Sequence, residues 1–129
     1  MADQNLDKSF IEDQKRRLLE IKAELERIRE GLDEDQQDRA EDEGDFTEHD
    51  SGDLGQSMFS REMDATIEGQ VGRRLEDVER ALEKIEEGSY GVCDDTGDEI
   101  PKGRLEAVPE AIRTVEAQQT FERERRPPA

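Results

Sequence analysis

The chain has 129 residues, of which 43% are charged and 30% hydrophobic, with no tryptophan and one tyrosine. This length predicts at most one domain, and the apolar content is too small for a thick globular core but sufficient for an elongated helical hairpin. The net charge of −18 argues against nucleic acid and anionic membranes as partners, and it favours a protein with a basic channel or cleft.

Residues 6–32 are predicted to form a long helix. Apolar residues recur every seven positions in two interleaved sets, as the a and d positions of a heptad do. Only Gln14 interrupts the second set. The two sets are Ile11, Leu18, Leu25 and Leu32, and Ile21 and Ile28. This spacing is typical of a coiled coil. Residues 33–53 are mostly acidic and contain Gly44 and Gly52, so we expect a solvated, mobile connection there.

A second helix is predicted over residues 54–87. Its apolar residues alternate by four and three, and they are Val71, Leu75, Val78, Leu82 and Ile85. Gly69 and Gly72 weaken this helix and suggest either a bend or a close approach of the first helix. Gly88 is placed to cap its carboxyl end. Two helices joined in this way favour an antiparallel coiled coil.

The remaining chain predicts a small module. Residues 90–93 and 98–101 are expected to pair as short strands around a turn at 94–97. A helical turn is expected at 103–107, and a last helix from near Pro109 to about Arg125. The predicted fold is therefore mainly α, with a long antiparallel coiled-coil hairpin in 1–88, a β-hairpin/helix module in 89–126 and a tail at 127–129.

Several motifs resemble the DksA/TraR family of bacterial transcription regulators, specifically a cysteine-poor, YteA-like branch. Residues 81–93, Ala-Leu-Glu-Lys-Ile-Glu-Glu-Gly-Ser-Tyr-Gly-Val-Cys, are similar to the entry into the family's zinc knuckle, and 97–109 to its exit. Residues 49–55, followed by Arg61 and Glu62, resemble the family's acidic D-x-x-D-x-A tip motif, with Gly55 in place of alanine.

The resemblance places the family's four zinc ligands at Cys93, Thr96, Thr114 and Ala117. Because a structural zinc site needs four nitrogen or sulfur ligands in a closed tetrahedron, we expect a degenerate zinc-finger-like module and no cofactor. Cys93 then becomes a small buried hydrophobe, and the two threonines bond to backbone groups. Packing is expected to replace the metal, through Tyr90, Val92, Ile100, Leu105, Val108 and Ile112. The alternative is a zinc site rebuilt from Cys93 with Asp94, Asp95 or His49.

Asp50 and Asp53 begin the second helix, where carboxylates cap free backbone N–H groups. The resemblance assigns this point, together with Arg61 and Glu62, to partner binding in the secondary channel of RNA polymerase. The plain alternative is that both aspartates are ordinary acids of a solvated loop.

No phosphate-binding loop, activated nucleophile or metalloprotease motif indicates an enzyme. The resemblance implies a transcription regulator that binds RNA polymerase directly, and the charge argues against sequence-specific DNA binding. The alternative is a non-catalytic coiled-coil interaction or stress protein that self-associates through Met58, Phe59 and Met63. A zinc-finger DNA binder conflicts with the charge.

One cysteine and no apolar run long enough to span a membrane favour the cytoplasm.

Overall fold

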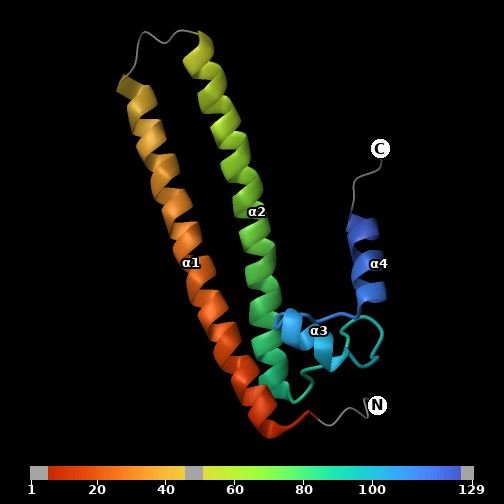
Figure 1. Ribbon diagram of the computed structural model, residues 1–129. Helices are drawn as coiled ribbons and strands as arrows, with labels where there is room; N and C mark the ends of the chain where they lie inside the picture. The colour runs from red at the N-terminus through yellow and green to blue at the C-terminus, as the bar shows by residue number, and fades with distance from the viewer. Residues whose placement is uncertain (1–5, 46–50, 126–129) are drawn as a thin grey trace. The chain divides into compact units, whose positions relative to one another are not determined.

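The computed structural model describes residues 6–45 and 51–125, and their side chains except those of 35–60 and 64. Its helices are α1 (Lys8–Asp45), α2 (Ser51–Glu87), α3 (Lys102–Ala107) and α4 (Val115–Arg125) (Figure 1). The chain divides into two compact units. We call Ala23–Leu75 the hairpin unit, and Met1–Lys22 with Glu76–Ala129 the knuckle unit.

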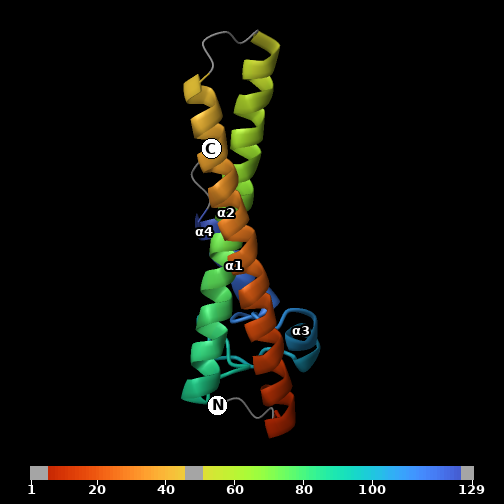
Figure 2. The ribbon, with the colours of Figure 1, turned by 90° about the vertical axis from the view of Figure 1, so that its left-hand side faces the viewer.

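The hairpin unit contains the second part of α1 and the first part of α2, which run antiparallel beside each other (Figures 1 and 2). Leu25, Val71 and Leu75 are buried between them, at 3–6% exposure. Ile28 and Ile67 stay more than one third exposed, because a two-helix seam has no third layer to cover it. The predicted helical hairpin is confirmed, and its core is thin.

The knuckle unit has the thicker core. Leu18 from the start of α1 and Val78 and Ala81 from the end of α2 are completely buried. The segment after α2 lies against these helix ends (Figure 2) and adds buried side chains of its own. These are Tyr90, Ile100, Leu105 and Ile112. Val92 and Val108 are only half-buried, so four of the six side chains expected to replace the metal are core residues.

The first helix is longer than the periodicity predicts. α1 continues to Asp45 and α2 already begins at Ser51, so the mobile connection expected over 33–53 is wrong for 33–45 and 51–53. The acidic run contains glutamate, glutamine, arginine and alanine, which are good helix formers, and its first glycine is Gly44. The loss of the apolar stripe marks the end of the packed seam and not the end of the helix.

The two predicted strands are reduced to a single antiparallel bridge between Val92 and Glu99. Two hydrogen bonds join the segments, from the amide of Cys93 to the carbonyl of Asp98 and from the amide of Ile100 to the carbonyl of Gly91, both at 2.8 Å. Beside the turn, the groups that would extend the ladder have other partners. The carbonyl of Cys93 accepts from the amide of Gly97 at 2.9 Å, and the amide of Asp98 donates to the hydroxyl oxygen of Thr96 at 3.2 Å. The predicted pairing is therefore present but too short to form two strands.

The last helix begins at Val115 and not near Pro109. The carbonyl of Pro109 accepts a hydrogen bond from the hydroxyl of Tyr90 at 2.8 Å. The carbonyl of Arg113 accepts one from Nε of Arg104 at 2.9 Å. A helix over this segment would need those carbonyls for its own hydrogen bonds. Thr114 supplies the start instead, because its hydroxyl oxygen accepts the amide proton of Ala117 at 3.2 Å.

Candidate functional site

The knuckle loop, residues 88–101, depends on glycines in the left-handed region. Gly88 has φ = 81° and ends α2, as predicted, and the amide of Ser89 donates to the carbonyl of Lys84 at 2.8 Å. Gly97 has φ = 78° and closes the predicted turn through a 2.9 Å hydrogen bond from its amide to the carbonyl of Cys93. These glycines bring the chain back over the end of α2.

The four positions that the resemblance assigns to zinc ligands lie together in this module. Cys93 is 2% exposed, which confirms it as a small buried side chain. The hydroxyl oxygen of Thr96 accepts the amide proton of Asp98 at 3.2 Å, and Thr114 bonds to the amide of Ala117. Both threonines therefore bond to backbone groups, as expected.

The sulfur of Cys93 accepts several hydrogen bonds that change the acidity of its thiol. Burial opposes ionisation of the thiol, but hydrogen bonds from the Thr96 hydroxyl and from the backbone amides of Asp95, Thr96 and Thr114 outweigh it. The pKa of Cys93 is therefore lowered from its ordinary value. The backbone still turns several N–H groups toward this one sulfur.

This donor set does not fit the zinc ion of a C4-type module. Threonine hydroxyls are not zinc ligands in structural sites, alanine has no donor atom, and one thiolate leaves the tetrahedron open. Among the residues that the structure describes, no group of three or more His, Cys, Asp or Glu side chains is arranged to hold a metal. A rebuilt site that includes His49 lies outside the described residues.

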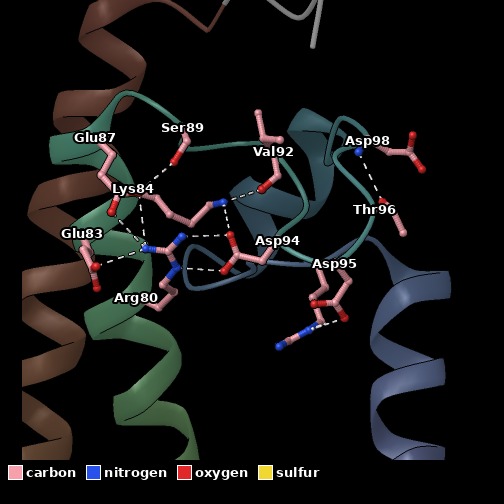
Figure 3. Close-up of polar contacts among 11 residues, drawn as sticks. Arg80, Glu83, Lys84, Glu87, Ser89, Val92, Asp94, Asp95, Thr96 and Asp98 are labelled. Carbon is pink, nitrogen blue, oxygen red and sulfur yellow. Dashed lines mark hydrogen bonds and ion pairs between the residues drawn. The ribbon is translucent and has the colours of Figure 1, made fainter. Parts of the chain in front are cut away.

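A cationic cluster fastens the knuckle loop to α2 (Figure 3). Lys84 is only 2% exposed, and its Nζ lies 2.6 Å from both the carbonyl oxygen of Val92 and Oδ1 of Asp94. Arg80 holds the same carboxylate with two bonds, Nε to Oδ2 at 2.9 Å and Nη2 to Oδ1 at 3.2 Å. One aspartate of the loop thus bridges two cations of the helix.

These cations change the acidity of Asp94. Partial burial alone would raise the pKa of its carboxyl, but the hydrogen bonds and positive charges of Arg80 and Lys84 dominate and lower it. This cluster was not predicted from the sequence. Lys84 lies away from the apolar face that Leu82 and Ile85 share, because each residue turns the helix by about 100°, so the apolar spacing gave no signal for it.

Gln14 is the second residue whose role the sequence analysis missed. It interrupts the heptad pattern, yet it is 2% exposed. Its Nε2 donates to the carbonyl of Leu105 at 2.7 Å and contacts the hydroxyl oxygen of Tyr90 at 3.1 Å, and its Oε1 accepts from Arg17 at 2.9 Å. The polar break in the stripe is therefore the point where α1 binds the module.

The predicted tip residues are only partly within the described chain. Asp50 lies outside the described residues, and Asp53 lies in the first turn of α2 with its side chain outside them. Arg61 and Glu62 are exposed on α2. The partner-binding role of these four residues stays a prediction. In the described part of the chain, no helix is long and apolar enough to cross a bilayer.

A known family and curated relatives match part of the chain. The prokaryotic dksA/traR C4-type zinc finger matches residues 88–123. General stress protein 16O of Bacillus subtilis is 50% identical over 70 residues, which is 54% of this chain and 43% of that protein. The uncharacterized protein YteA of Bacillus subtilis is 40% identical over 65 residues, which is 50% of this chain and 27% of that protein. The chain thus aligns with less than half the length of these two relatives.

Solved structures extend the likeness to nearly the whole chain. An RNA polymerase binding protein and transcriptional regulator, Dks of Chlamydia trachomatis, is 32% identical with a TM-score of 0.58 over 93% of this chain and 95% of its own. Transcription factor DksA2 of Pseudomonas aeruginosa is 27% identical, with a TM-score of 0.70 over 93% and 89%. The knuckle, the helical hairpin and these likenesses together show that the chain belongs to the DksA/TraR family.

Proposed function

We propose that this protein regulates transcription by binding RNA polymerase directly, without reading a DNA sequence. The observation that carries the proposal is the likeness, over nearly the whole of both chains, to a protein described as an RNA polymerase binding transcriptional regulator. The charge of −18 supports it, because a strongly acidic surface repels DNA and is attracted to a basic cleft. The partner would place the protein in the cytoplasm, and no enzymatic step is part of the proposal.

The tip of the hairpin is the proposed point of action. The carboxylates of Asp50 and Asp53 would enter the secondary channel, with Arg61 and Glu62 as further contacts. There they would bias mobile elements of the polymerase through its arginine and lysine side chains. The knuckle unit would act as a rigid support that folds without a metal, because its ligand positions are filled by Thr96, Thr114 and Ala117.

The double variant Asp50→Asn with Asp53→Asn tests the tip. Its matched control is Glu12→Gln with Glu20→Gln, which removes the same charge from exposed positions of α1. In transcription with purified polymerase, the tip variant is expected to lose the regulatory effect while its affinity for polymerase changes little. The control is expected to keep both. Full regulation by the tip variant would refute the role of the acidic tip.

A second candidate is a non-catalytic interaction protein of the stress response. The half-exposed side chains of Ile28, Met63 and Ile67 on the hairpin unit favour it, as does the identity with General stress protein 16O. Met58 and Phe59, also expected on this surface, have side chains outside the described set. Co-purification separates the two candidates, because only the first requires core polymerase in the complex.

A further inference from the structure

An open groove in the knuckle unit lies between residues 95–101 and α4. Pro101, Val115 and Phe121 give it apolar walls. Val115, in the first turn of α4, is 47% exposed, whereas Ala117 is the one buried residue of that helix. An exposed aliphatic side chain beside a concave surface is a place where another apolar side chain can be buried.

The arginines that line the groove are already engaged. Arg104 donates through Nε to the carbonyl of Arg113 at 2.9 Å. Arg113 pairs through Nε with Asp95 Oδ2 at 2.8 Å, and its guanidinium lies 3.7 Å from the ring centre of Phe121. Asp95 therefore offsets the charge of Arg113, and Arg104 is held in the wall by a backbone carbonyl.

Apart from Asp95, the acidic residues of the groove add negative charge that these two arginines do not balance. Asp98, Glu116 and Glu124 are exposed along it. Glu99 also lines it, and its Oε1 is buried without a hydrogen-bond partner among the described residues. A buried carboxylate oxygen without a donor is costly, and the charge of this carboxylate adds to the negative charge of the groove.

We propose that this groove binds an extended basic peptide segment of a partner protein. An aliphatic side chain of the segment would pack on Val115, and flanking lysine or arginine side chains would meet the acidic rim, including Glu99. The surplus of carboxylates over engaged arginines selects a basic peptide and rejects nucleic acid. The proposal goes beyond the action of the hairpin tip, and the full chain alone suffices to test it.

Two capped pentapeptides of equal charge serve as probes, Lys-Arg-Leu-Lys-Arg and Lys-Arg-Gly-Lys-Arg. Both experience the general attraction of an acidic protein, so only the groove can prefer leucine. Burying one leucine side chain corresponds to a preference of about tenfold or more. Isothermal titration is expected to show this preference, and amide shifts in NMR are expected at residues 95–101 and in α4.

Three variants sharpen the test. Val115→Arg is expected to abolish the leucine preference, and Glu99→Gln to weaken binding of both peptides by up to about fivefold, as expected for the loss of one partly exposed charge. Leu19→Arg, at a side chain of similar exposure (49%), is expected to leave the preference intact. Circular dichroism confirms that each variant folds.

Equal affinity for the two peptides, or a leucine preference that survives Val115→Arg, would overturn the proposal. The same holds if the free protein forms a dimer that Val115→Arg dissociates in sedimentation, since a second copy would then occupy the groove.

Discussion

The substitution Lys84→Met tests the cluster that fastens the knuckle loop to α2. Methionine keeps the length and apolar stem of the side chain and removes only the ammonium group. The carbonyl of Val92 then loses its 2.6 Å donor, and Asp94 keeps only Arg80. Removing one partner of a buried ion pair typically costs about 3–5 kcal/mol. Because Arg80 still holds the carboxylate, we expect about 2–3 kcal/mol.

Native-state hydrogen exchange measures this loss where it occurs. The amides of Cys93, Asp94 and Ile100 are bonded to the carbonyls of Asp98, Ile112 and Gly91, so they exchange only when the loop opens. A loss of about 2–3 kcal/mol predicts roughly 30- to 150-fold faster exchange at these amides. Amides in the hairpin unit are expected to change much less.

Lys15→Met is the matched control. Lys15 also forms an ion pair from a helix, with Glu86 at 3.2 Å, but the two side chains are 46% and 72% exposed. A surface pair of this kind contributes about 0–1 kcal/mol. If Lys84→Met accelerated exchange no more than Lys15→Met does, the loop would not depend on the buried ammonium and the reasoning would be wrong.

Further predictions concern acidity, helix propensity and metal. The folded-state pKa of Asp94 lies below its ordinary value. The contribution of Asp94 to stability is therefore fully present above about pH 4 and is lost as the pH falls through the folded-state pKa. Urea titrations of Asp94→Asn at several pH values should show a smaller loss of stability in acid, and an unchanged dependence on pH would contradict this prediction. Gly72→Ala should stabilise the protein by about 0.5–1 kcal/mol, because an added Cβ meets nothing within 4 Å. Gly88→Ala should destabilise the protein by about 1 kcal/mol, because residue 88 has φ = 81°. A lower melting temperature for Gly72→Ala, or a higher one for Gly88→Ala, would refute the argument. Purified protein should contain far less than one zinc per chain by elemental analysis, and its melting temperature should not change with EDTA; stoichiometric zinc would show that the threonine positions had been misjudged.

The features that follow from local sequence were predicted well. The heptad spacing places Leu18 and Leu25 in the seam, and Gly88 and Gly97 occupy the left-handed positions that glycine favours. Of the two alternatives for Gly69 and Gly72, a close approach of the first helix is wrong. A Cβ added at Gly69 would meet only Arg73 of the same helix, at 3.4 Å, and one added at Gly72 would meet nothing within 4 Å.

Contacts between distant residues were not predictable. Gln14 bonds to residues 76 and 91 positions away, and no local pattern distinguishes such a glutamine from an exposed one. The start of α4 was misplaced for the same reason, because the carbonyls of Pro109 and Arg113 are bound by Tyr90 and Arg104. Helix boundaries here are set by tertiary hydrogen bonds that compete with the helix.

Site-specific crosslinking to RNA polymerase tests the central claim most directly. A photoreactive amino acid is placed at Ser51, directly after Asp50, or at Ser57, four residues after Asp53, and at Glu12 as a control in the knuckle unit. The account predicts that the α2 positions crosslink to polymerase segments lining the secondary channel and that Glu12 does not. Failure of both α2 positions to label polymerase, in a sample where the complex forms, would contradict the account.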